Sequence, residues 1–447
     1  MSIVDEYVRR RKTSKEVFER AREVFPGGFT RAPFVQGVYP TFMARAQGCK
    51  MWDVDGNEYI DYVNNYGPLL LGHNHPSVVK KVDECKENGL WSGAMTKWEV
   101  ELAEKVVGMY RGIERMLFTD SGSAAVGKAV RGCRYVTGKK YVAYKATAYH
   151  GAYDSCWPLV PEREAGIPRE LIDLLICLPL NDGDAAERII RDNKDRLACV
   201  LNEPTLGHLG HEHNNEMLEY NKQLREITEN YGIPMVMDEI VTGFRYAPGG
   251  YGERFGVVGD YTALNKVLGH GMPLGAFGSS EENMKYWAPS IQSDSVQTKP
   301  AALQNPGTLN DWKLACAAGL GAMSELKPEL YQHLEHLGDK LRTGLKGILS
   351  DLRINAQVVG VSSIFHLLFI DEKIRTNEQV DKSNSFLYRT FELGCMTKGI
   401  NLGKNHHSFL SSPMTDKDID HTLDVMREVL TSMKPTIETT APNLIEK

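Results

Sequence analysis

The residue that most directly suggests chemistry is Lys266, a single cation that ends the mostly apolar run starting at Tyr261. Glycine-rich backbone follows it as far as Gly278. A buried lysine tends to lose its proton, because desolvation disfavours the charged form. The neutral amine is a nucleophile that can condense with an aldehyde. We therefore expect Lys266 to be buried and to act as a nucleophile.

A carboxylate at the end of another apolar run, Pro234–Asp238, supplies a second reactive group. A carboxylate beside a pyridine nitrogen keeps that nitrogen protonated, and the protonated ring accepts electrons when a bond at a substrate Cα breaks. An aldehyde-trapping lysine together with such a carboxylate is what a pyridoxal phosphate enzyme needs. Without Lys266, a purely structural Asp238 would be an equally good interpretation.

The sequence Asp120-Ser-Gly-Ser123 follows an apolar strand and opens a helix-like stretch. Free amides and the positive dipole at a helix N-terminus bind phosphate well. The hydroxyls of Ser121 and Ser123 add donors. Taken alone, the pattern fits a plain serine cap better than a phosphate site.

The same stretch also satisfies a nucleotide-binding pattern, G-x-x-x-x-G-K, from Gly122 to Lys128. The strand ending at Asp238 resembles the carboxylate strand of nucleotide hydrolases, so a P-loop-like hydrolase is a remote alternative. Against it, Ala129 stands where bound Mg²⁺ needs a Ser or Thr hydroxyl. That alternative also leaves Lys266 unexplained.

The elements that must position these residues alternate between strand and helix. Six short apolar strands are predicted at 115–119, 140–144, 197–202, 234–238, 261–265 and 274–279. Helical stretches separate them, which is typical of an α/β fold with a mainly parallel sheet and helices on both faces. Ligands bind at the carboxyl ends of strands in such sheets. Outside this region we predict helices over 14–25, 76–110 and 312–350, and a hairpin over 51–62.

Length and composition set the broad class. The chain has 447 residues, 42% hydrophobic and 25% charged, with a net charge of −6. That length exceeds one typical core, so two domains are expected. The charge suggests neither nucleic acid nor an anionic membrane as a partner. Eight scattered cysteines, no signal-peptide core and no membrane-length apolar run indicate a cytoplasmic protein. The histidines of 208–213 fit no catalytic zinc spacing, so no metal is expected.

Taken together in their order along the chain, the motifs resemble those of the class III pyridoxal-phosphate-dependent aminotransferases of fold type I. The resemblance is greatest to the glutamate-1-semialdehyde aminomutase branch. The matching stretches span about residues 20 to 430 and are 25–28, 52–62, 66–68, 71–76, 121–123, 149–151, 203–204, 238–245, 266–278 and 307–308. The resemblance implies a large cofactor-binding domain over 73–325. A smaller α+β domain would form from both chain ends, 1–72 and 326–447.

The resemblance also assigns roles. Lys266 would carry pyridoxal 5′-phosphate as an aldimine and then shuttle the proton, and Asp238 would pair with the pyridine nitrogen. Thr308 would reach the phosphate of the neighbouring subunit, which implies a homodimer with shared active sites. The other implied cofactor contacts are Ser121, Gly122 and Ser123 at the phosphate, Ile240 and Tyr149 on the two ring faces, and His150, Glu203 and His208.

The substrate side departs from the aminomutase pattern. Arg31 is displaced from the position of that enzyme's carboxylate-binding arginine, Tyr66 replaces a tryptophan, and His406 replaces a glutamate. Near the cofactor, Ala124 replaces a glutamate and His208 an asparagine. The resemblance therefore predicts an intact cofactor site and an altered substrate site at Arg31, Tyr66 and His406.

The expected activity is an aminotransferase that moves an amino group between an amino compound and a keto acid in a ping-pong cycle. The same cofactor chemistry serves aminomutases, racemases, lyases and decarboxylases, and these stay open as alternatives. In those reactions His406 could be a second acid or base, since imidazole titrates near neutral pH.

Overall fold

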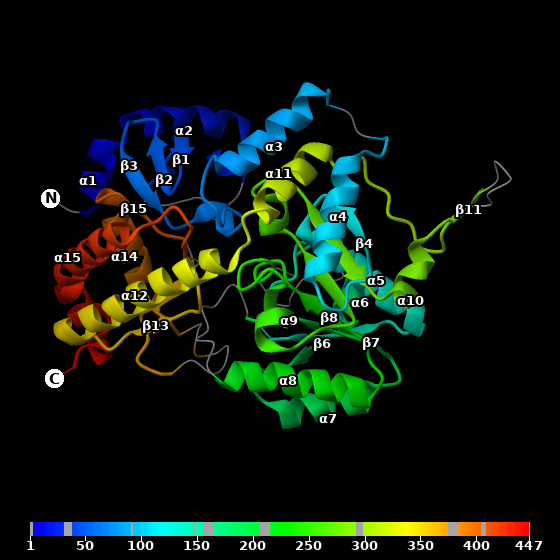
Figure 1. The fold of residues 1–447 in the computed structure, drawn as a ribbon. Helices are drawn as coiled ribbons and strands as arrows, with labels where there is room; N and C mark the ends of the chain where they lie inside the picture. The colour runs from blue at the N-terminus through cyan, green and yellow to red at the C-terminus, as the bar shows by residue number, and fades with distance from the viewer. Residues whose placement is uncertain are drawn as a thin grey trace. The chain divides into compact units, whose positions relative to one another are not determined.

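The computed structural model describes residues 3–30, 38–90, 93–146, 148–154, 165–205, 215–291, 298–373, 379, 382–403 and 408–446. The chain divides into two compact units (Figure 1). Unit 1 takes in Met1–His75 and Pro328–Lys447, so both ends of the chain contribute to it. Unit 2 takes in Pro76–Gly207 and His213–Lys327.

Unit 2 is built on a seven-stranded sheet with the order β4-β10-β9-β8-β7-β5-β6. Strand β10 is antiparallel to both of its neighbours, and the pairs from β9 to β6 are parallel. The predicted mainly parallel sheet is therefore confirmed. The strands are β4 (Arg115–Thr119), β5 (Tyr141–Lys145), β6 (Leu175–Leu178), β7 (Leu197–Asn202), β8 (Met235–Asp238), β9 (Tyr261–Leu264) and β10 (Gly275–Ser279).

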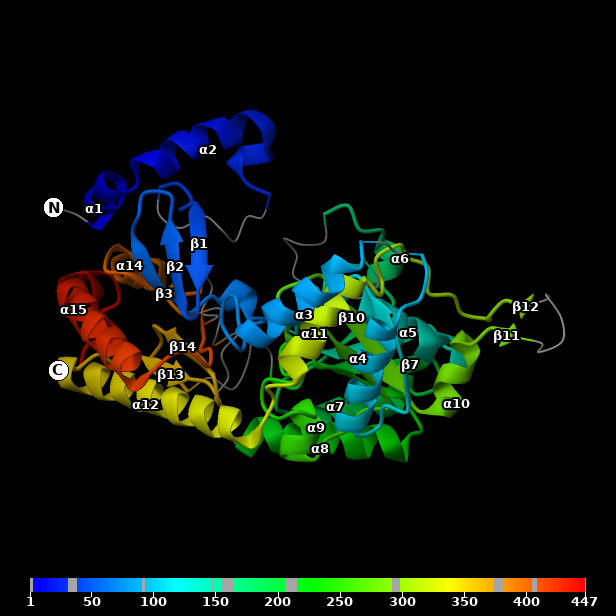
Figure 2. The same cartoon turned by 45° about the horizontal axis from the view of Figure 1, so that its top comes forward.

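Helices cover both faces of this sheet, because β7 to β10 are buried throughout and must be shielded on each side. On one face, α5 (Gly122–Thr137) packs Ala125 and Val130 against the sheet. On the other, α7 (Gly183–Asn193) and α8 (Asn215–Asn230) lie side by side in Figures 1 and 2. They contribute Ile190 and Leu224 to a second cluster.

The remaining elements of unit 2 surround this core. Helix α11 packs against α3 and α4. The bounds are α3 (Pro76–Glu87), α4 (Lys97–Met109), α6 (Arg169–Ile172), α9 (Gly250–Phe255), η5 (Lys266–Gly269), α10 (Glu281–Met284), η6 (Lys285–Trp287), β11 (Ser290–Ile291), β12 (Thr298–Lys299) and α11 (Lys313–Met323).

The helix predicted over 76–110 is two helices, because each has its own boundary signal. Helix α3 is followed by Gly89, which has φ +85°. Helix α4 then begins with a capping box in which Thr96 and Glu99 bind each other's backbone amides. The helical periodicity of the apolar residues alone does not show this break.

Strand register brings the ends that matter to one edge of the sheet. Thr119 at the end of β4 pairs with Gly275, and Leu264 at the end of β9 pairs with Ala276. Asp238 pairs with Ala263 across β8 and β9. The residues that follow β4, β5, β7, β8 and β9 therefore leave the sheet from the same edge.

The described residues of unit 1 form two small sheets and five α-helices. The predicted hairpin is confirmed as β2 and β3, joined by a turn in which Gly56 has φ +86°. The elements are α1 (Ile3–Arg10), α2 (Lys12–Val24), η1 (Pro26–Gly28), β1 (Met43–Gln47), β2 (Lys50–Asp53), β3 (Glu58–Asp61), η3 (Asn64–Tyr66), α12 (Pro328–Leu352), β13 (Gln357–Val359), β14 (Ile364–Leu368), α14 (Ser385–Thr397), β15 (Ile400–Asn401), β16 (Ser408–Phe409), α15 (Asp416–Thr440) and η8 (Pro442–Leu444).

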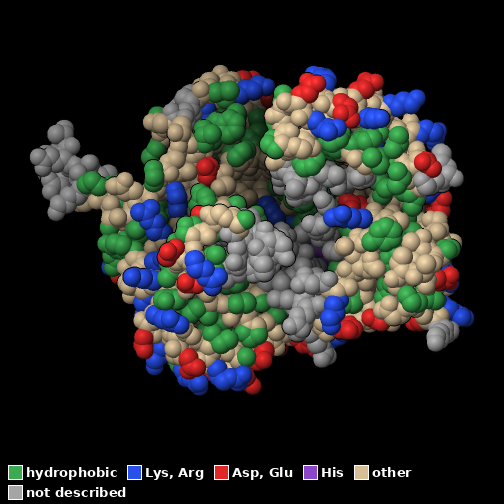
Figure 3. Space-filling model, turned by 180° about the vertical axis from the view of Figure 1, so that it is seen from behind, with side chains coloured by type: hydrophobic (Ala, Val, Ile, Leu, Met, Phe, Trp, Pro, Cys, Tyr) green, Lys and Arg blue, Asp and Glu red, His purple; other side chains and the backbone are tan. Residues whose placement is uncertain are grey.

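The surface carries charges of both signs. Acidic and basic side chains of the described residues are interspersed on the face seen in Figure 3. Within the described part of the chain, no helix combines the length and the apolar character needed to cross a bilayer.

Candidate active site

Asp238, at the end of β8, is only 2% exposed and is held by two neighbours. Its Oδ2 lies 2.7 Å from Nδ1 of His150, and its Oδ1 accepts a hydrogen bond of 3.1 Å from the amide of Ile240. A buried carboxylate needs such partners to offset the loss of water. The structure thus joins three residues that the resemblance placed around the ring, and gives His150 a partner that sequence patterns did not reveal.

Lys266 leaves the end of β9 in an unusual backbone conformation, with φ +47°. Left-handed backbone costs a non-glycine residue about 1–3 kcal/mol and is concentrated at functional sites. The side chain is half-buried, so it is less buried than the sequence led us to expect. The neighbouring Asn265 fixes the turn, since its Nδ2 donates to the carbonyl of Leu274 at 2.6 Å.

The residues predicted to hold the phosphate lie at the start of α5, close to the loop that contains Gly151 and Ala152. Ser121 caps this helix by accepting the amide of Ala124, so the plain capping role is present. Ser123 Oγ accepts the amide of Ala152 at 3.0 Å. A Cβ added at Gly151 would lie 2.5 Å from Ser123 Oγ, so only glycine permits this approach.

Gly122 lies beside Ile240, because a Cβ added at Gly122 would be 2.9 Å from Cδ1 of that side chain. The start of α5 and the residues after β8 are therefore neighbours. Ile240 and the amides of Gly122 and Ser123 belong to one region, as the resemblance implied.

Tyr149 and Glu203 form another pair. The amide of Tyr149 donates to Oε2 of Glu203 at 2.9 Å, and Glu203 is buried at the end of β7. The resemblance implied only that Glu203 lies among the cofactor contacts. Its observed contact fixes the backbone of the residue expected to stack on the ring.

These strand ends fit pyridoxal phosphate by the chemistry of their donors. The N-terminus of α5 suits a phosphate dianion, Asp238 suits a protonated pyridine nitrogen, and Lys266 suits an aldehyde. Two buried polar atoms of the same region, Nε2 of His150 and Oδ1 of Asn202, have no hydrogen-bond partner among the described residues. Such atoms are typical of sites that bind a polar group.

Thr308 lies in an exposed segment with Leu309. Lys128, the lysine of the nucleotide-binding pattern, contacts Oδ1 of Asn305 and the carbonyl of Pro306. That lysine therefore supports the segment before Thr308.

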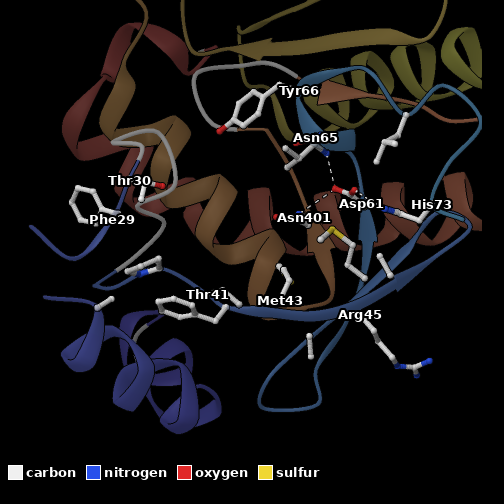
Figure 4. A pocket seen from close by; sticks show the side chains of 18 of the residues that line it. Phe29, Thr30, Thr41, Met43, Arg45, Asp61, Asn65, Tyr66, His73 and Asn401 are labelled. Carbon is white, nitrogen blue, oxygen red and sulfur yellow. Dashed lines mark hydrogen bonds and ion pairs between the residues drawn. The ribbon is translucent and has the colours of Figure 1, made fainter. Parts of the chain in front are cut away.

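Tyr66 lies in unit 1 and lines a cavity of about 700 Å³. Phe29, Met43 and Tyr66 approach this cavity from three different segments (Figure 4). Tyr66 has φ +64°, after two asparagines that are also left-handed. The strained segment and the contribution of Phe29 were not predictable from the residue pattern. The other substrate-side candidates Arg31 and His406, and the cofactor candidate His208, lie outside the described residues.

Comparison with known proteins adds independent evidence. The family model for aminotransferase class-III matches residues 34–430. A glutamate-1-semialdehyde 2,1-aminomutase from Persephonella marina is 36% identical over 425 residues, covering 92% of this chain and 96% of the relative. An omega-transaminase from Sphaerobacter thermophilus has a TM-score of 0.85 at 30% identity, covering 94% of this chain and 98% of that one.

A transaminase solved with pyridoxal phosphate bound has a TM-score of 0.85 at 27% identity, with 95% of this chain and 99% of that one covered. The fold, the order of the motifs and the family match agree, and the P-loop hydrolase alternative is excluded by that match. The chain belongs to the class-III aminotransferases, with a type I fold and pyridoxal 5′-phosphate as its cofactor.

Proposed function

We propose that this chain is an aminotransferase that moves an amino group between an amino compound and a keto acid. The observation that carries the proposal is the convergence of Lys266, the Asp238–His150 pair and the Gly122–Ser123 amides at one edge of the sheet. When bound, the cofactor supplies an electron sink for the bond broken at the substrate Cα.

Each residue then has a defined task. Lys266 Nζ would take the proton from the substrate Cα and deliver it to C4′ of the cofactor, the carbon of its aldehyde group. Asp238, held by His150, would keep a proton at the pyridine nitrogen. The start of α5 would anchor the phosphate, while Ile240 and Tyr149 would hold the ring from its two faces and exclude water.

An aminomutase is the second candidate function, favoured by the 36% identity to a glutamate-1-semialdehyde 2,1-aminomutase. Against it stand the substrate-side differences at Tyr66 and His406. Racemases, lyases and decarboxylases would use the same cofactor-side residues.

One experiment separates these activities. The cofactor-loaded protein is mixed with a panel of amino compounds in the absence of any keto acid, and both the cofactor spectrum and the products are followed. An aminotransferase converts one equivalent of amino donor and stops until a keto acid is added. Continued turnover without a keto acid would overturn the proposal, and conversion of glutamate-1-semialdehyde would identify the aminomutase.

We also propose a homodimer in which Thr308 serves the site of the second subunit. The exposed Thr308 segment supports this, as does the apolar groove between α4 and residues 305–311. Met95, Val100 and Leu309, at or beside that groove, are 78%, 45% and 49% exposed. A buried interface would cover such side chains.

The described cysteines are free thiols, which supports a location in the reducing cytoplasm.

A further inference from the structure

A fully buried polar cluster lies in unit 2 on the side of the sheet covered by α8. We call it the Lys145 cluster, and it consists of Lys145 at the end of β5, Asn221 on α8 and Tyr251 on α9, each 0% exposed. Buried polar side chains are costly unless they satisfy one another. No role for these residues follows from the cofactor chemistry described above.

Asn221 is the centre of the cluster. Its Oδ1 accepts from Nζ of Lys145 at 3.1 Å. Its Nδ2 donates to the carbonyl of Pro204 and to the hydroxyl of Tyr251, both at 2.8 Å. The single amide therefore connects the end of β5, the turn after β7, and α9.

Lys145 sets the orientation of this amide. An amine donates N–H whether or not it carries the extra proton, and the carbonyl of Pro204 can only accept, so the oxygen of Asn221 faces Lys145 and its Nδ2 faces Pro204. Both hydrogens of Nδ2 are then available for Pro204 and Tyr251. A flipped amide would place its N–H₂ against the lysine and its oxygen against the carbonyl of Pro204. Two acceptors would then face each other without a hydrogen between them.

The two groups bound by Asn221 each lead to the proposed cofactor site. Pro204 follows Glu203, whose carboxylate holds the amide of Tyr149. The amide of Tyr251 donates to Oε2 of Glu239 at 2.7 Å, and Glu239 directly follows Asp238.

We propose that Lys145 and Asn221 are positioning residues, which fix the strand ends carrying Glu203 and Asp238 so that Tyr149 and Asp238 meet the cofactor correctly. This inference rests on the proposed function for the use of those strand ends. The geometry it assigns can be measured in the protein without cofactor. Both residues would act indirectly, through the turn after β7 and through α9, and not by contact with the cofactor.

The test compares Asn221→Asp, which keeps the acceptor for Lys145 but removes both donors, with Lys145→Met, which removes the donor to Asn221. The matched control is Leu224→Ala, which opens a cavity one turn along α8 in the apolar cluster that α7 and α8 form with the sheet. Hydrogen–deuterium exchange of cofactor-free protein is measured at the amides of Tyr149 and Tyr251. The affinity for pyridoxal phosphate is measured on the same samples.

We expect both test variants to lose protection at these two amides while α5 keeps its protection. Asn221→Asp should also weaken pyridoxal phosphate binding about tenfold. The control should instead lower protection uniformly across the apolar cluster of α7, α8 and the sheet, in proportion to the loss of global stability. The proposal is overturned if the test variants match that uniform pattern, or if both amides and the cofactor affinity stay unchanged. If exchange changes as expected but the unsubstituted protein shows no transamination, the proposed function fails and the positioning role stands.

Discussion

Replacing Lys145 with methionine should abolish a specific part of the pH dependence of stability. Burial lowers the pKa of Lys145 from its usual 10.5 to about 7, with the charge of Glu203 acting in the opposite direction. One pKa unit corresponds to about 1.4 kcal/mol. The shift of roughly 3.5 units therefore represents about 5 kcal/mol, an order-of-magnitude cost of keeping this amine charged inside the fold.

The sign follows from proton counting. Between about pH 7 and 10.5 the unfolded chain holds a proton on Lys145 that the folded chain has released. The free energy of unfolding then rises with pH, because the unfolded state binds more protons. The full cost applies below pH 7 and is relieved as the pH rises towards 10.5. From pH 7 to pH 9 the expected gain is about 2 kcal/mol.

Urea unfolding of the cofactor-free protein at several pH values between 7 and 9 measures this effect. Taking the difference between the native chain and Lys145→Met cancels the contributions of tyrosines and cysteines common to both. We expect the native chain to gain about 2 kcal/mol relative to the variant over this interval. Parallel pH profiles for the two proteins would refute a buried amine with a depressed pKa.

Three further substitutions probe the site. Gly151→Ala, at φ +97° with no room for a Cβ, should weaken pyridoxal phosphate binding at least about tenfold in a titration of the cofactor. The control Gly108→Ala, where the space for a Cβ is open, should leave this affinity unchanged. His150→Leu removes the partner of the buried Asp238 carboxylate, which costs about 1–3 kcal/mol. It should lower both cofactor affinity and kcat, with an unaltered kcat counting against the pair. Thr308→Ala should weaken cofactor binding, and mixing it with a Lys266-substituted chain should restore one competent site per mixed dimer, which sedimentation and activity measurements would check.

The sheet and its order of motifs could be predicted because strand positions depend on local patterns. The run Leu197–Leu201 is apolar throughout and is followed by Asn202, and both predicted bounds agree with β7. Strand β6 was not predicted. It is an edge strand whose four residues are mostly half-exposed, and it has neither continuous burial nor strict alternation. Nothing local distinguishes it within the apolar stretch around it.

The contacts of the site could not be predicted, because they depend on register between distant segments. His150 and Asp238 are 88 residues apart in the sequence, and Lys145 and Asn221 are 76 apart. A lysine inside a strand and an asparagine inside a helix are unremarkable until the sheet and α8 bring them together. The half-burial and left-handed backbone of Lys266 are likewise products of the turn after β9.

The most direct test of the central claim is to reduce the purified, cofactor-loaded protein with borohydride and to map the modified residue by mass spectrometry. We expect an absorbance band in the region of about 400–430 nm that disappears on reduction, with a phosphopyridoxyl group fixed on Lys266. Lys266→Ala should lack both the band and the modification while still binding the cofactor reversibly. Modification of a different lysine, or an unchanged spectrum in Lys266→Ala, would contradict the assignment of this residue as the one that holds pyridoxal phosphate.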